Sequence, residues 1–141
     1  MEAYIYSEPL IIKYDNYLNT LVAIWNTPID LPNEEYVELV YSFIDAVNYF
    51  KPDHVLIHAS NSNYAIPSDV QEWINETVFP LYKKYNTQKL AIIMSTDFFA
   101  QLSFESITED LKNLTFDIKY FESEEDALHW IDQGNNQKYF A

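Results

Sequence analysis

Two groups of polar side chains lie at the ends of short apolar segments of the chain, and their spacing could support chemistry. The apolar segments, 54–60 and 89–96, are typical of buried strands in a parallel sheet. Because the carboxyl ends of parallel strands meet at one edge of a sheet, where α/β proteins bind ligands, the sequence predicts a polar rim there. Such a rim would suit a small polar ligand or a loop of a partner protein. It consists of Ser60, Asn61, Ser62, Ser95, Thr96 and Asp97.

A structural interpretation of the same residues competes with this one and is favoured. Asp97 precedes a helical pattern and is well suited to cap it, and serine and asparagine side chains often satisfy backbone groups in loops. A Ser–His–Asp triad is not indicated, because the nucleophile elbow requires glycines and the sole glycine of the chain is Gly134. Phosphate-binding and dinucleotide-binding loops need glycines for the same reason. The sequence therefore predicts no catalytic residues and no cofactor.

Two histidines, His54 and His58, lie on the first of these predicted strands. Residues four apart on a strand share a face but are separated by about 13 Å, so these two cannot bind one metal ion together. The chain contains no cysteine, and we expect no metal site. His58 could act as a general base at the carboxyl end of its strand, although a histidine hydrogen-bonded at a strand end is the favoured interpretation.

The net charge is −14, from 22 acidic and 8 basic residues, and every basic residue is lysine. Nucleic-acid binding requires basic side chains that displace counterions from phosphates, and anionic lipid attracts basic segments, so we expect neither as a partner. An acidic run near the C-terminus could bind a cation. However, a calcium loop needs alternating oxygen ligands and usually a glycine, so a solvated helix start is favoured. The run consists of Glu122, Glu124, Glu125 and Asp126.

The apolar pattern predicts the order ββαβαβαβα, which is one α/β domain with a mixed, mostly parallel sheet flanked by helices. The domain is predicted to cover residues 1–132, followed by a polar tail at 133–141 that is frayed. The predicted strands are 8–15, 16–26, 54–60, 89–96 and 116–122. The predicted helices are 34–50, a segment after Ser68, 97–114 and a segment after Ser123.

Helix ends can also be predicted from the sequence. Asn33 is predicted to cap the first helix, and Ser68 with Gln71 to form a capping box at the second. Pro80 should kink the second helix or split it into two. Ser123 is predicted to cap the last helix.

The N-terminus, MEAYIYSEPLIIKY, has an acidic residue where a signal peptide would be basic. No apolar run approaches the roughly 20 residues that cross a bilayer. We therefore expect a soluble, cytoplasmic protein without a membrane span.

Three stretches of the chain carry a resemblance to a known family: AIWNTPIDLPNEEYVELV, KLAIIMSTD and IKYFESEEDALHWI. With the order of the elements, they resemble the SpoIIAA-like proteins of the STAS/CRAL-TRIO-like group, above all its small uncharacterised bacterial members. The resemblance implies that fold and no particular activity. In the last stretch, small Ala127 would let the closing helix approach the sheet, and Trp130 and Ile131 would seal the domain edge. The matching positions are Trp25, Glu34, Glu35, Phe121, Glu124, Glu125, Ala127 and Trp130.

Signalling members of this group carry a phosphorylatable serine at a helix start, which would imply a phosphosite at Ser62 or Ser68. The corresponding stretch, HASNSNYAIPSDV, holds both of these serines and Ser60, but it lacks the glycine and the preceding aspartate of the family's motif. The match to this motif is therefore partial. A phosphate near a helix N-terminus would nevertheless be stabilised there.

The main functional hypothesis is a non-enzymatic binding or regulatory module that contacts a protein partner through exposed helix faces and the polar rim. The alternative is a module that binds a small apolar ligand or lipid in a pocket like that of CRAL-TRIO domains, lined by the abundant Tyr and Phe. A sizeable enclosed apolar pocket would favour the alternative, and an exposed apolar patch the main hypothesis. A homodimer is compatible with both, because closed twofold pairs are common.

Overall fold

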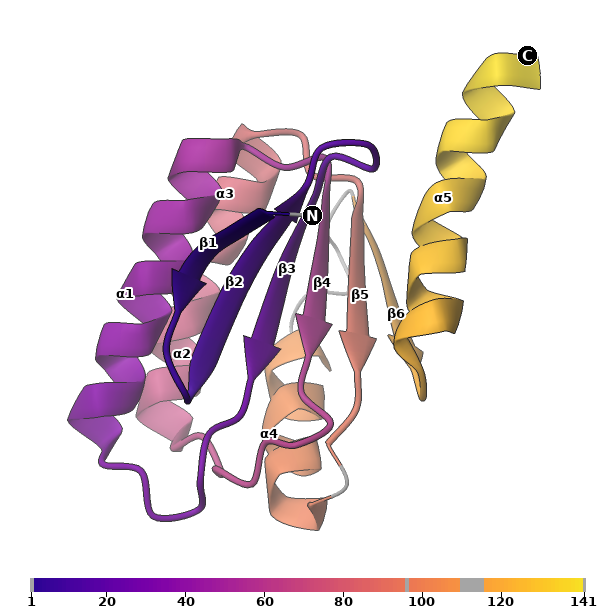
Figure 1. Ribbon diagram of the computed structural model, residues 1–141. Coiled ribbons are helices and arrows are strands. Elements are labelled where there is room, and N and C mark those ends of the chain that lie inside the picture. The colour runs from indigo at the N-terminus through magenta and orange to yellow at the C-terminus, as the bar shows by residue number, and fades with distance from the viewer. Residues whose placement is uncertain (1, 96, 110–115, 141) are drawn as a thin grey trace.

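The computed structural model describes residues 2–95, 97–109 and 116–140, which contain one six-stranded sheet (Figure 1). The strands lie side by side in chain order. The first three strands pair antiparallel, whereas the third to the sixth are parallel to one another. The strands are β1 (Glu2–Tyr6), β2 (Leu10–Asp15), β3 (Thr20–Trp25), β4 (His54–His58), β5 (Lys89–Ile93) and β6 (Asp117–Phe121).

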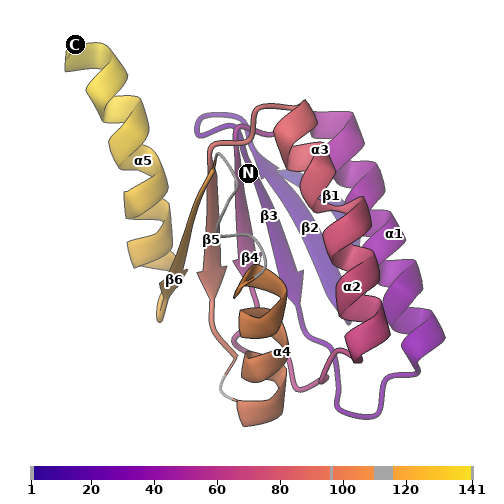
Figure 2. The ribbon, with the colours of Figure 1, turned by 180° about the vertical axis from the view of Figure 1, so that it is seen from behind.

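The helices are distributed unequally over the two faces of the sheet (Figures 1 and 2). They are α1 (Asn33–Phe50), α2 (Ser68–Thr77), α3 (Phe79–Lys84), α4 (Phe98–Glu109) and α5 (Glu124–Phe140). The first four helices contribute to the larger apolar core, which includes Leu10 and Ile12 of the sheet. On the other face, α5 packs against a smaller cluster that includes Val22 and Leu56. Within the described residues, no helix combines the length and hydrophobicity that a bilayer span requires.

The predicted fold class is confirmed: the chain forms an α/β domain whose sheet is mixed and mostly parallel. The predicted order of elements is present, with β1 added at its start. This edge strand is formed by EAYIY, a segment rich in residues that favour strands, and it pairs antiparallel with β2. The second predicted helix is divided into α2 and α3, and Pro80 lies in the first turn of α3, which is one of the two predicted effects of this proline.

The predicted caps at Asn33 and Ser68 are wrong. Each of these residues is the first of its helix, follows a proline and forms no capping hydrogen bond. The proline holds an extended backbone, as at Pro32 with φ −60° and ψ 139°, so the helix begins one residue earlier than predicted. The predicted capping box is also absent, because Gln71 donates from Nε2 to the carbonyl oxygen of Ile66 over 2.7 Å.

The last helix begins as predicted and continues further than predicted. The Oγ atom of Ser123 accepts a hydrogen bond of 3.2 Å from the backbone N–H of Asp126, which is the predicted cap. The helix then extends to Phe140, past the predicted start of the tail at residue 133. Ala127 and Ile131 are fully buried against the sheet, so this helix covers β4 to β6 on one face of the sheet.

Candidate functional site

The polar residues predicted to form the rim lie in the loops that follow β4 and β5. These loops run beside each other, because the backbone N–H of Ala59 donates to the carbonyl oxygen of Ile93 over 3.0 Å. Ser60 is half-buried, Asn61 is exposed, and both Ser62 and Ser95 are buried. Asp97 is half-buried, and Thr96 lies outside the described residues.

A buried hydrogen-bond network uses the hydroxyl groups of Ser62 and Ser95. The Ser62 Oγ atom lies 2.5 Å from the Oγ1 atom of Thr27, which follows β3. Ser95 donates from Oγ to the carbonyl oxygen of Ser62 over 2.5 Å, and its Oγ accepts from the backbone N–H of Asp97 over 3.0 Å. An Asp97 carboxylate oxygen accepts from the backbone N–H of Ala100 over 3.0 Å, and so caps α4. These contacts fit the structural interpretation of the rim.

Sequence reasoning missed Thr27, although it links three strand ends through this network. Its partner Ser62 is 35 residues further along the chain. The position of Thr27 directly after a buried strand was the only signal. That signal does not identify the partner, because pairing depends on how the loops fold over the edge of the sheet.

His58 and Ser60 form a half-buried pair at this edge. The Nδ1 atom of His58 lies 3.2 Å from the Oγ atom of Ser60, and both residues are half-buried. His58 and His54 share the α5 side of the sheet, as their spacing predicts. In the described part of the chain, no group of three or more metal-ligating side chains could hold a metal ion.

The two serines considered as phosphosites have opposite environments. Ser62 is 2% exposed, and its hydroxyl is occupied by Thr27, so a kinase could reach it only if the loop opened. Ser68 is exposed in the first turn of α2. A phosphate there would lie near the positive end of the helix dipole.

An apolar cavity of about 70 Å³ lies between the helical layer and the sheet. Its walls include Trp25, Phe43 and Ile92, together with the rings of Tyr36 and Tyr82. Burial raises the pKa of both tyrosines well above the ordinary value, because a phenolate would lose its hydration in this apolar environment. Ligand sites commonly enclose about 300–1,000 Å³, and a cavity of about 150 Å³ holds a molecule as small as benzene or xenon. This cavity is therefore too small for a lipid.

A larger depression of about 330 Å³ lies at the surface between α4 and the end of β6. It is lined by two carboxylates, Glu105 and Glu122, and by Tyr120 among others. Its volume would admit a small molecule, but it is open to solvent and would bury little of one. Ligand sites instead cover most of the surface of the molecule that they bind.

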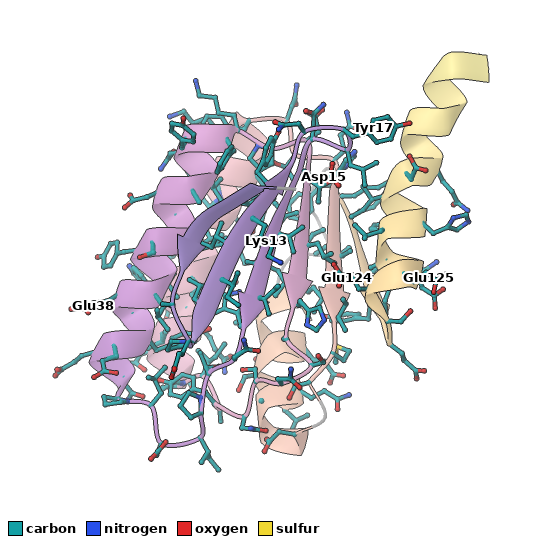
Figure 3. The ribbon with its side chains drawn as sticks, in the orientation of Figure 1. Lys13, Asp15, Tyr17, Glu38, Glu124 and Glu125 are labelled. Carbon is teal, nitrogen blue, oxygen red and sulfur yellow. The ribbon has the colours of Figure 1, made fainter. Side chains whose placement is uncertain are left out.

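The part of the sheet formed by β1 to β3 has no described helix over the face on which α5 packs (Figure 1). Lys13 and Asp15 lie on this face and carry opposite charges (Figure 3). Ile11 and Ile24, which pair across β2 and β3, are half-buried beside them. This face therefore carries charged and apolar side chains side by side.

The outer surfaces of α1 and α2 form a face of one charge, which we call the acidic face. It carries seven exposed carboxylates, four from α1 and three from α2, and neither helix contains a basic residue. Figure 3 shows Glu38 on the outer side of α1, on the opposite side of the molecule from Glu124 and Glu125 at the start of α5. The seven are Glu34, Glu35, Glu38, Asp45, Asp69, Glu72 and Glu76.

Large aromatic and aliphatic side chains are exposed on and beside the acidic face. Tyr41 of α1 is 54% exposed, and its ring contacts the half-buried ring of Trp73 of α2, edge to face, with centroids 5.1 Å apart. Tyr49, in the last turn of α1, is 70% exposed, and Ile29, in the loop before α1, is 74% exposed. Sequence reasoning placed these aromatics on helices but could not show that Tyr41 meets Trp73.

Comparisons of the chain with protein-family models, curated proteins and solved structures found no match. The resemblance to the SpoIIAA-like proteins therefore stays a prediction.

Proposed function

We propose that the protein is a non-enzymatic binding module that contacts a protein partner through the acidic face. The observation that carries this proposal is the exposure of two tyrosines of α1, Tyr41 and Tyr49, on or beside the acidic face, with Ile29 exposed in the loop before the helix. Single exposed apolar residues are normal, but aromatic residues that gather on one surface are typical of protein interfaces. The contact between Tyr41 and Trp73 restricts the two rings relative to each other, so less side-chain entropy would be lost on binding than for two separate rings.

The environment of the rim supports a non-enzymatic function. The hydroxyls of Ser62 and Ser95 hold loops together, and the Asp97 carboxylate caps a helix. A nucleophile and its base must instead present their reactive atoms to a substrate. Of the predicted rim, Asn61 is exposed and Ser60 and Asp97 are half-buried, as is His58.

The alternative function, binding of a small apolar ligand or lipid, has less support. The apolar cavity has the right lining but a volume of only about 70 Å³. A lipid chain would need several times this space. Accommodating one would require α1 or α2 to move away from the sheet and expose Trp25 and Phe43.

Site-specific photo-crosslinking in the cells that naturally produce the protein tests the proposal. A photoreactive phenylalanine analogue would replace Tyr41 in one variant and Tyr17 in a matched control. Tyr17 is 75% exposed in the turn between β2 and β3, far from the acidic face (Figure 3). We expect a discrete covalent adduct with a second polypeptide from position 41 and none from position 17. No adduct at position 41, or the same adduct at both positions, would contradict the proposal.

A further inference from the structure

We propose that the partner presents an arginine-rich segment to the acidic face, with a guanidinium group stacked on the Tyr41–Trp73 pair. This inference rests on the proposed function and adds the chemistry of the partner. It follows from three features of the face: its charge, the placement of its aromatic pair and the way its charge excludes other partners.

The charge of the face is the first feature. Seven exposed carboxylates on two neighbouring helices, without a basic residue on either, repel one another across the surface. The Debye length at physiological ionic strength is about 8 Å, so neighbouring carboxylates on a helix interact within it. A partner of opposite charge relieves this repulsion and is steered towards the face from a distance.

The placement of the aromatic pair is the second feature. On α1, Glu38 lies three residues before Tyr41 and Asp45 four residues after it. Residues at these spacings share one face of a helix, so both carboxylates flank the Tyr41 ring.

The same arrangement occurs on α2. Asp69 lies four residues before Trp73, and Glu76 lies three residues after it. The two rings meet with centroids 5.1 Å apart, so the pair is bracketed by carboxylates from both helices.

This arrangement selects arginine over lysine. A guanidinium group is planar, stacks on aromatic rings and can donate two parallel hydrogen bonds to a carboxylate, whereas an ammonium group is a compact and strongly hydrated charge. Arginine can therefore satisfy the rings and the flanking carboxylates together. A lysine-rich segment would gain the charge attraction but less of the stacking.

The charge of the face also excludes other partners. A second copy of this chain, joined by a twofold axis through the acidic face, would set the same seven carboxylates against themselves. Nucleic acid and anionic lipid would be repelled in the same way. A basic protein segment is the macromolecular partner that matches this charge.

Calorimetric titration of the full chain with nona-arginine tests the inference, with a nona-citrulline peptide as the uncharged control ligand. The first variant replaces the four bracketing carboxylates: Glu38→Gln, Asp45→Asn, Asp69→Asn and Glu76→Gln. Its matched control removes the same charge elsewhere: Glu122→Gln, Glu124→Gln, Glu125→Gln and Asp126→Asn. All eight residues are exposed, so both variants should fold, which circular dichroism will verify.

We expect nona-arginine to bind and nona-citrulline not to bind. The bracketing variant should bind nona-arginine about tenfold more weakly, and the control variant less than about threefold more weakly. Tyr41→Ser should weaken binding of nona-arginine more than that of nona-lysine, whereas Tyr17→Ser should change neither. Equal weakening in the two charge variants, or an unchanged ratio of arginine to lysine affinity in Tyr41→Ser, would overturn the inference. An adduct at position 41 together with these negative results would leave the proposed function in place and reject only the arginine-rich partner.

Discussion

Replacing Ile131 with alanine should destabilise the domain strongly, because this side chain anchors α5 to the sheet. Ile131 is fully buried in the smaller apolar cluster, together with Leu56 and Ile93. The substitution removes three carbon atoms, which at about 0.8 kcal/mol each gives a loss of about 2.4 kcal/mol. The cavity that remains adds to this, so we expect the free energy of unfolding to fall by about 3–4 kcal/mol.

Urea unfolding followed by circular dichroism will measure this loss at equilibrium. Leu128→Ala is the matched control, since Leu128 lies on the same helix and borders the same cluster but is only half-buried. Leu128→Ala should lower the free energy of unfolding by about half as much as Ile131→Ala, because less of the Leu128 side chain leaves water on folding. A loss below about 1 kcal/mol for Ile131→Ala, or equal losses for the two variants, would refute the packing of α5 on the sheet.

Four further substitutions test other parts of the structure. Ala127→Trp should lower the melting temperature by overpacking a fully buried position, at a cost of about 1–3 kcal/mol or more, and an unchanged melting temperature would contradict the placement of Ala127. Burial raises the pKa of Tyr82, so above pH 10 only the unfolded chain ionises there and stability is lost as pH rises. At pH 11 the free energy of unfolding should be about 1.4 kcal/mol lower for this reason than at pH 9. Denaturant titrations at the two pH values should show this decrease in the natural chain and lack it in Tyr82→Phe. An equal pH dependence in both proteins would argue against the burial of Tyr82. Ser95→Ala should lower the free energy of unfolding, measured in urea, by about 1–3 kcal/mol. The reason is that the Ser62 carbonyl oxygen and the Asp97 N–H lose their hydrogen bonds to the Ser95 hydroxyl. Ser68→Ala, at an exposed position without a capping bond, should cost almost nothing.

The sequence predicts most of the fold because the signals for its elements are local. Apolar runs such as HVLIH and KLAII match β4 and β5, and the helical spacing of apolar residues over 34–50 matches α1. The capping predictions failed where two local signals compete. At Asn33 and Ser68 the favourable cap residue follows a proline, and the conformation of the proline determines where the helix begins.

The candidate site is less predictable, because it depends on contacts between distant segments. The sequence predicts that Ser62 and Ser95 lie at one edge of the sheet, since parallel strands end together. It does not predict that Thr27 reaches Ser62 or that the ring of Tyr41 meets that of Trp73. Those contacts follow from how loops and helices pack, and a periodic pattern specifies only which side of each helix faces the core.

The most direct test of the central claim is to map the binding of nona-arginine on the protein by NMR. Amide chemical shifts of the uniformly labelled chain would be followed during titration at physiological ionic strength. The largest changes should fall in residues 38–45 of α1 and 69–76 of α2, and added salt should reduce them. Changes centred on the start of α5, or spread evenly over all acidic segments, would contradict a specific site for a basic partner on the acidic face.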